Sequence, residues 1–475
     1  MSNLASPLAA SVLALAATIC VAAEQTSRPP NIVLILVDDL GWADIGCFGA
    51  DLHETPHIDR LAERSVRFTN GYAAASICSP TRASIMSGKY PARLNLTIWH
   101  EYARSPRPSP GKLNPPASLD HLPVEEFTLA EALKQRGYTT LHVGKWHLGD
   151  GGYYPEAHGF DVNIGGTHWG APATYFWPFA GWFGRGREEW RYVPGLPFGR
   201  AGDYLTDRLT DDALQLIDRV KDRPFYLNLW YHTVHTPIEA KPEDVQRYAS
   251  MPREGLHHQN PTYAGMVKSL DDNVGRLLAK LDELGIADNT LVVFTSDNGG
   301  TIVEHKGMPV TSNHPLRSGK GSLYEGGIRV PWIIHWPDIT PAGAVCGEPV
   351  CSTDLYPTLL EIAGIQGDAE HNRTVDGKSL APLLRDPSSR LDRDTLYFHY
   401  PHYYPTTTPV SAIRDGDWKL LEYFEDAHVE LYDLAHDLGE RHDLAPSMPG
   451  RAAALQKKLA EWRTSVDARV PTSAP

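Results

Sequence analysis

The sequence NIVLILVDD at residues 31–39 joins a continuous apolar run to two aspartates. Such β-branched and leucine runs are typical of a strand that is buried on both faces of a largely parallel sheet. Similar runs follow at residues 139–143, 225–231 and 290–295, and amphipathic helical patterns at 205–220 and 267–284 lie between them. Strands that alternate with helices predict a large α/β domain with helices on both faces of its sheet.

The pattern of predicted secondary structure changes after about residue 390. Residues 412–424 and 430–434 have the pattern of short antiparallel strands, and residues 452–462 have that of a closing helix. We therefore expect a large α/β domain at residues 24–390 and a small α+β subdomain with an antiparallel sheet at residues 391–475.

The N-terminal residues 4–23 are apolar and uncharged, and they end in the small residues Val21-Ala22-Ala23. This pattern predicts a cleaved export signal at residues 1–23 and a periplasmic or secreted protein. An N-terminal anchor is the alternative. No later stretch has the length of a membrane span, so none is expected after the signal is removed.

The composition of the 475 residues is that of a globular protein, with 42% hydrophobic and 21% charged residues. A formal net charge of −14 argues against nucleic acid or an anionic membrane as a partner. An anionic substrate would need a local cluster of cations. Four cysteines beyond the signal are too few for a disulfide-built scaffold, and the spacing of Cys346 and Cys351 does not decide whether they pair.

Two acidic pairs follow two of the predicted strands, Asp38-Asp39 after the first and Asp297-Asn298 after the run at 290–295. Ligands in open α/β sheets bind at the carboxyl ends of the strands. Each pair alone is more often a helix cap or a turn. Both pairs together form a set of oxygen donors that favours Ca²⁺, with Mg²⁺ second and Zn²⁺ disfavoured.

The motif CSPTR at residues 78–82 places a cysteine two residues before a proline and four before an arginine. This arrangement is a recognisable signal for enzymatic modification of the cysteine. The alternative is a buried cysteine before a helix that proline helps to start.

Residues 30–445 resemble a type I sulfatase of the alkaline phosphatase superfamily. The resemblance is carried by six separated signatures: LVDDLGWADIGCFG at 36–49, CSPTRASIMSGKYPAR at 78–93, GKWHLG at 144–149, HTVHTP at 232–237, TSDNGG at 295–300 and GKGSLYEGGIRVP at 319–331. The resemblance implies a large α/β domain with a mixed central sheet, followed by a smaller domain with a four-stranded antiparallel sheet and a helix.

The resemblance also implies that Cys78 is oxidised to Cα-formylglycine by a formylglycine-generating enzyme. One hydroxyl of the hydrated aldehyde would attack sulfur, and the other would later collapse to the aldehyde and expel sulfate. The residue at 78 would share one Ca²⁺ with Asp38, Asp39, Asp297 and Asn298.

The same resemblance assigns roles to the remaining catalytic candidates. Arg82 would hold the hydrated aldehyde, Lys145 would contact the sulfate or the hydrate, and Lys320 would contact the sulfate. His147 would take the proton from the second hydroxyl. His235 would protonate the departing sugar oxygen, and His232 in the same motif is its lower-ranked rival.

Substrate recognition is expected from polar and aromatic residues, a mixture that suits sugars. The candidates are Trp99, His100, His168, Trp169, Asn313, His314, Arg317, His399 and His402. Arg317 ranks first because it lies three residues before Lys320. The segments HTVHTPIEAKPE and FHYPHY resemble those of bacterial sulfatases that remove single sulfates from chain ends. We therefore expect a sulfated glycan as substrate, with the 4-O-sulfate of galactose or N-acetylgalactosamine as the favoured group.

Three alternatives remain at this level. One is a sulfatase for another sulfated sugar or an aryl sulfate. A phosphatase or phosphodiesterase of the same superfamily would use a Ser or Thr nucleophile and two transition metals, which the CSPTR motif and the oxygen-rich donor set disfavour. A carbohydrate-binding pseudoenzyme would result if the cysteine stayed unmodified.

Overall fold

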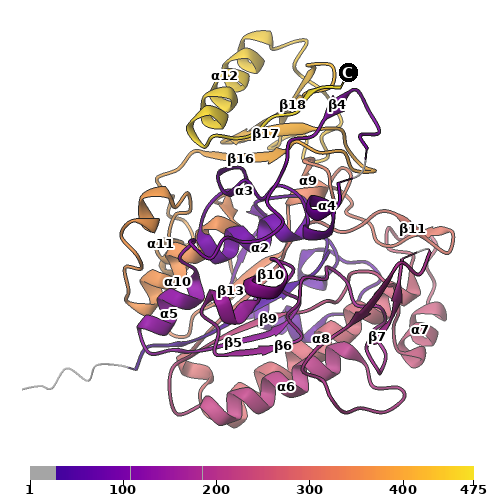
Figure 1. Cartoon of the computed structure of the whole chain (residues 1–475), viewed down its shortest axis with the longest axis vertical. Coiled ribbons are helices and arrows are strands. Elements are labelled where there is room, and N and C mark those ends of the chain that lie inside the picture. The colour runs from indigo at the N-terminus through magenta and orange to yellow at the C-terminus, as the bar shows by residue number, and fades with distance from the viewer. Residues whose placement is uncertain (1–27, 107, 185, 475) are drawn as a thin grey trace, which may run out of the picture.

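A mixed eight-stranded sheet forms the centre of the protein in a computed structural model that describes residues 28–106, 108–184 and 186–474 (Figure 1). The predicted export signal lies outside the described residues. In spatial order the strands are β14 (Ala344–Cys346), β2 (Val66–Phe68), β13 (Trp332–His335), β10 (Thr290–Ser296), β1 (Asn31–Val37), β9 (Phe225–Trp230), β5 (Thr139–Gly144) and β6 (Val162–Ile164). The strands from β10 to β6 are parallel, whereas β13 is antiparallel to both β10 and β2. The predicted α/β fold is confirmed.

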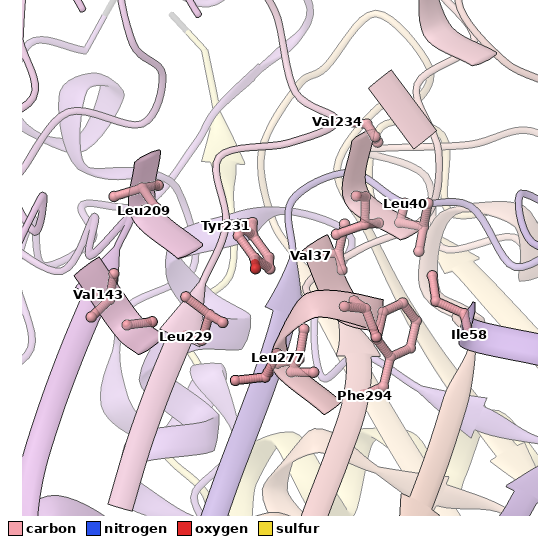
Figure 2. Close-up of a cluster of buried hydrophobic side chains, with 14 of the residues drawn as sticks. Val37, Leu40, Ile58, Val143, Leu209, Leu229, Tyr231, Val234, Leu277 and Phe294 are labelled. Carbon is pink, nitrogen blue, oxygen red and sulfur yellow. The ribbon is translucent and has the colours of Figure 1, made fainter. Parts of the chain in front are cut away.

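Helices cover both faces of this sheet, as the unbroken apolar run of β1 requires. Val33, Ile35 and Val37 point to one core, and the alternate residues of the strand point to the other. The first core lies under α1 (Pro56–Glu63), α6 (Leu205–Val220) and α8 (Pro261–Glu283), and Figure 2 shows part of it. The second lies under α2 (Cys78–Ser87), α5 (Leu129–Gln135), α10 (Leu355–Ala363) and α11 (Ala381–Arg385).

The register of the parallel strands brings their carboxyl ends to one edge of the sheet. Val37 pairs with Ser296, and Trp230 pairs with both Leu36 and Gly144. Gly144 has φ +106°, and a Cβ there would lie 2.0 Å from the carbonyl oxygen of Trp230. Only glycine therefore lets β5 end this close to β9 and deliver the following loop to the shared edge.

A second sheet of four antiparallel strands follows the large one, and it lies with α12 at the top of Figure 1. Its strands are β16 (Thr395–Tyr400), β17 (Val410–Asp415), β18 (Trp418–Tyr423) and β19 (Val429–Asp433). Leu455, Leu459 and Trp462 of α12 (Pro449–Ser465) belong to the core of this sheet. The predicted antiparallel sheet and closing helix are confirmed, whereas the boundary at residue 390 stays a prediction.

Shorter elements complete the chain. The remaining helices are α3 (Pro91–Leu94), α4 (His100–Arg104), α7 (Pro242–Ala249) and α9 (Glu325–Ile328), with 3-10 turns at Gly46–Phe48, Gly151–Tyr153, Pro155–His158, Ala287–Asn289, Ser352–Asp354 and His371–Thr374. Small two-stranded pairs join β3 (Gly71–Tyr72) to β15 (Val350–Cys351), β4 (Leu113–Asn114) to β20 (Thr472–Ser473), β7 (Ala180–Phe183) to β8 (Glu189–Tyr192) and β11 (Glu304–His305) to β12 (Met308–Pro309).

Two open questions from the sequence concern cysteines and membranes. Cys346 and Cys351 are both free thiols, so they are not bridged. Within the described ranges, no helix combines the length and the apolarity that crossing a bilayer requires.

A buried charge network joins the second sheet to the α/β domain. The Nζ atom of Lys419 on β18 lies 2.8 Å from a carboxylate oxygen of Glu325 on α9 and 2.8 Å from one of Glu440. Burial raises the pKa of Glu440 from 4.5 to about 7, and the carboxylate of Glu325 adds to this effect although Lys419 opposes it. One lysine thus serves two carboxyl groups.

This network predicts a pH-dependent stability. The folded protein holds a proton on Glu440 that the unfolded chain releases near pH 4.5. The contribution of this group to stability is therefore present below about pH 4.5 and is lost as the pH rises through about 7, by at most about 1.4 kcal/mol per pH unit. We expect Glu440→Gln to raise the melting temperature relative to the wild type at pH 8 and to change it little at pH 5. The exposed change Glu461→Gln is the control, and equal shifts at both pH values would contradict the prediction.

Candidate active site

The four predicted metal ligands lie together at the sheet edge. Asp38 and Asp39 follow β1, Asp297 and Asn298 follow β10, and all four side chains are buried. The amide of Asp39 donates to Oδ1 of Asp297 at 3.2 Å, and Nδ2 of Asn298 donates to Oδ1 of Asp39 at 2.8 Å. The parallel register therefore brings both acidic pairs to one point.

Cys78 reaches this point from the opposite direction, as the first residue of α2. Its Sγ and carboxylate oxygens of Asp38 and Asp297 all lie within 4.8 Å of one another. Arg82, one turn further along α2, donates from Nε to Oδ2 of Asp297 at 2.8 Å and from Nη1 to the carbonyl of Lys145 at 2.9 Å. The helix thus presents both the cysteine and the arginine of the motif to the acidic cluster.

Two lysines complete the charge balance of the cluster. Nζ of Lys145 lies 2.7 Å from Oδ2 of Asp38, and Nζ of Lys320 lies 2.7 Å from Oδ1 of Asp39. Burial raises the pKa of Asp38 well above its ordinary value, and Lys145 only partly offsets this. Burial also opposes ionisation of Asp39, but Lys320 and His235 outweigh it and hold the pKa of Asp39 below its usual range.

The donor set fits a hard divalent cation. Oδ1 of Asp38 and Oδ1 of Asn298 are buried and have no hydrogen-bond partner. Unpartnered buried acceptors are costly, and a cation between them would satisfy both. Because the donors are carboxylate and amide oxygens, they suit Ca²⁺ or Mg²⁺ better than Zn²⁺.

A cavity of about 1000 Å³ opens beside Cys78. His147, His235 and Lys320 line it together with Cys78, whereas His232 does not. His235 has Nε2 3.6 Å from Oδ2 of Asp39. Burial, reinforced by Lys320, lowers the pKa of His235 to about 3. Burial lowers the pKa of His147 to about 4, although Glu101 opposes it.

The outer walls of the cavity hold some of the predicted substrate-binding residues and several that sequence reasoning missed. Trp99, His100 and His168 line it, and the rings of the two histidines lie 5.3 Å apart. The missed residues are Glu101, Arg104, Phe183, Arg191 and Tyr404. They come from α4, from the β7–β8 hairpin and from the loop after β16, where no motif marks them.

Three predicted substrate contacts lie elsewhere. Asn313, His314 and Arg317 line a separate cavity of about 780 Å³. Arg317 stacks on Tyr324 and donates to Tyr432. The side-chain amide of Asn313 donates to the carbonyls of Gly300 and Ser318. The structure therefore places these three residues in a different cavity from Lys320, and their part in substrate recognition stays a prediction.

The remaining candidates do not line the cavity of Cys78. His399 is buried on β16, with Nδ1 2.7 Å from Ser411 and Nε2 2.9 Å from the carbonyl of Arg469. His402 is buried with Nε2 2.8 Å from the hydroxyl of Thr97. Trp169 donates to Glu189 at 2.9 Å and does not line the cavity of Cys78.

Comparison with known proteins accords with this geometry. The Sulfatase family matches residues 30–365, and the family "N-sulphoglucosamine sulphohydrolase, C-terminal" matches residues 318–465. Steryl-sulfatase of Mus musculus is 33% identical, over 89% of this chain and 80% of that protein. Human N-acetylgalactosamine-6-sulfatase is 31% identical, over 94% of this chain and 88% of that protein.

A solved structure extends the likeness to three dimensions. Ps i-CgsB, determined in complex with k-i-k-neocarrahexaose, has a TM-score of 0.76 and 31% identity, covering 92% of this chain and 93% of its own. The family match over most of the chain, the relatives that it covers and the shared fold together show that the chain belongs to the sulfatase family and is an enzyme that hydrolyses sulfate esters.

Proposed function

We propose that this sulfatase removes single sulfates from the ends of sulfated glycans, with Cys78 converted to formylglycine and one Ca²⁺ bound. The observation that carries the proposal is the position of Cys78. It lies at the start of α2, within 4.8 Å of carboxylate oxygens of Asp38 and Asp297, and it lines the cavity that Lys320, His147 and His235 share. The residues around it supply cations for a sulfate and imidazoles for proton transfer.

Two groups would complete this site. A formylglycine at 78, made by a formylglycine-generating enzyme, supplies a hydrated aldehyde as nucleophile and as the means of sulfate release. Asp38, Asp39, Asp297 and Asn298 would hold the Ca²⁺, which supplies polarisation of a sulfate oxygen. The unpartnered oxygens of Asp38 and Asn298 support this assignment.

The side chains of the chain itself neutralise and orient the sulfate. Lys145 and Lys320 each lie 2.7 Å from a carboxylate, so their ammonium groups are held at the edge of the acidic cluster. Arg82 is fixed by Asp297 and by the carbonyl of Lys145. These contacts fix the three cations beside the acidic cluster, and Lys320 also lines the cavity in which negative charge would develop.

The two histidines of the cavity divide the proton transfers. His235 donates a proton from its ring to the leaving oxygen, because an alcohol is a poor leaving group at neutral pH. The negative charge of a bound sulfate ester favours the protonated form of this imidazole. His147 accepts the proton that is lost during sulfate release.

The cavity walls support a sugar as the sulfated group. Trp99 and Tyr404 offer aromatic surface, while His100 and His168 offer hydrogen-bonding nitrogens. The 4-O-sulfate of galactose or N-acetylgalactosamine is the favoured substrate, and action at chain ends suits a cavity built from several loops. An aryl sulfate is the second candidate, favoured by the 33% identity to human Arylsulfatase A over 97% of this chain. Export to the periplasm or outside the cell, directed by residues 1–23, would bring the enzyme to such substrates.

Removal of the cation is expected to weaken both folding and activity. Without it, the carboxylates of Asp38, Asp39 and Asp297 repel one another in a buried site. We expect a calcium chelator to lower the melting temperature and to abolish hydrolysis, and added Ca²⁺ to restore both. Elemental analysis should find one calcium per chain, whereas two zinc ions per chain would contradict the assignment.

Conversion of Cys78 decides whether the chain is catalytic. Mass spectrometry of the peptide that contains residue 78 should find formylglycine in active protein. Cys78→Ala should abolish hydrolysis across a panel of defined sulfated saccharides, while Cys47→Ala, which changes a free thiol outside the cavity, should retain it. Full activity of protein shown to contain only cysteine at 78 would overturn the mechanism.

Activity confined to the interior of long polymers would overturn the preference for chain ends.

His235 should matter most when the leaving group needs a proton. We expect His235→Ala to lower kcat/KM about 10²- to 10⁴-fold for a sugar sulfate, and far less for an activated aryl sulfate whose phenolate leaves unprotonated. His232→Ala is the matched control, because His232 belongs to the same motif but does not line the cavity, and it should affect both substrates alike. Equal losses for His235→Ala on the two substrates would remove it from this role.

A further inference from the structure

Glu101 forms the shortest contact made by the ring of His147. Its Oε2 lies 2.7 Å from Nε2 of His147. Glu101 is on α4, in the wall of the cavity that holds Cys78, and about a quarter of its side chain is exposed. No motif in the sequence marks this glutamate, and its role must be read from its contacts.

The position of the His147 ring is fixed from several sides. The backbone amide of His147 donates to the carbonyl of Thr167 at 2.8 Å, and its carbonyl accepts from the hydroxyl of Ser79, the neighbour of Cys78, at 2.7 Å. Gly170 lies close against the imidazole, since a Cβ there would fall 2.4 Å from Cε1. The ring therefore has little freedom to turn, and its two nitrogens have distinct surroundings.

Glu101 itself is held by groups that keep it ionised. Its Oε1 accepts from the amide of Gly170 at 2.9 Å and lies 3.2 Å from Nη2 of Arg191. Burial opposes ionisation, but His147 and Arg191 outweigh it and hold the pKa of Glu101 well below its ordinary value. An ionised carboxylate can only accept hydrogen bonds. The nitrogen that faces it, Nε2 of His147, must then carry a hydrogen.

The other nitrogen of the ring is left free. Nδ1 of His147 is buried and has no hydrogen-bond partner. In a neutral imidazole with a hydrogen on Nε2, Nδ1 is the acceptor. We propose that Glu101 is a positioning residue that fixes His147 in the tautomer with Nε2 protonated, so that Nδ1 is the atom that accepts the proton during sulfate release. The inference rests on the role proposed above for His147, and it follows the general logic of a base that is oriented by a third group.

The same contacts would also fit a purely structural ion pair between Glu101 and Arg191. The two readings differ in what happens at His147. A structural pair leaves the His147 tautomer unchanged when the charge of Glu101 is removed, and its loss affects activity whether or not His147 is present. A positioning residue acts only through the imidazole.

The tautomer can be measured without turnover. Protein labelled with ¹⁵N-histidine and carrying Cys78→Ala is homogeneous at position 78, and the signals of His147 are identified by their loss in His147→Gln. We expect the nitrogen shifts of a neutral ring protonated at Nε2, and a shift toward a mixture of tautomers in Glu101→Gln and Glu101→Ala. An unchanged His147 spectrum in both variants would overturn the proposal.

Steady-state kinetics of protein that retains Cys78 provide a second test of the proposal. We expect Glu101→Gln to lower kcat on the order of 10- to 100-fold with a much smaller change in KM, the usual size of effect for a group that orients a functional histidine. The same change added to His147→Gln should have almost no further effect, because the two residues act as a unit. Losses that multiply in the double variant would overturn the proposal.

A matched control is available elsewhere in the chain. Glu126 also pairs with a histidine, with its Oε2 3.3 Å from Nδ1 of His371, and neither residue lines the cavity of Cys78. Glu126→Gln removes the same charge from a similar pair and should leave the His147 spectrum unchanged. If the wild type hydrolysed no sulfated saccharide or aryl sulfate, the proposed function would fail, while the spectra would still decide the tautomer.

Discussion

Three carboxylates are buried side by side at the carboxyl edge of the large sheet. The positive side chains around them compensate for the free-energy cost of burying these charges. A buried carboxylate without compensation loses several kcal/mol of hydration, and three of them also repel one another. Arg82, Lys145 and Lys320 each approach one of them within 3 Å. The protein thus gathers, inside a chain of net charge −14, a buried cluster of carboxylates and cations, of which Lys320 also lines the cavity of Cys78.

The sheet topology explains how residues so distant in sequence meet. Asp38 and Asp297 belong to neighbouring parallel strands, whose carboxyl ends coincide because their registers match. Cys78 arrives on a helix that packs against the opposite face of the sheet from α6 and α8. Lys320 comes from a loop near the second sheet. The groups thus come from the ends of two strands, from one helix and from one loop.

The parts of the site that follow regular elements could be predicted from sequence. The runs at 31–37 and 290–295 became the central strands, and the acidic pairs after them met as expected. The substrate wall could not be predicted in the same way. Arg317 is only three residues from Lys320, but it lines the other cavity and its guanidinium packs on Tyr324. Glu101 was overlooked because a lone glutamate in a short helix has no periodicity or spacing that signals a partner 46 residues away.

The junction between the two sheets has a consequence for how such a protein can be altered. The segment that carries Lys320 continues into α9, where Glu325 is tied to Lys419 of the second sheet, and the hydroxyl of Thr406 donates to the carbonyl of Lys320 at 2.7 Å. Tyr404, from the same loop as Thr406, lines the cavity itself. The C-terminal sheet is therefore structurally coupled to the active site. Exchanging it between homologues would move a wall of the active site and one of its cations, so recombination is expected to succeed only when the α9 segment and its partners travel together.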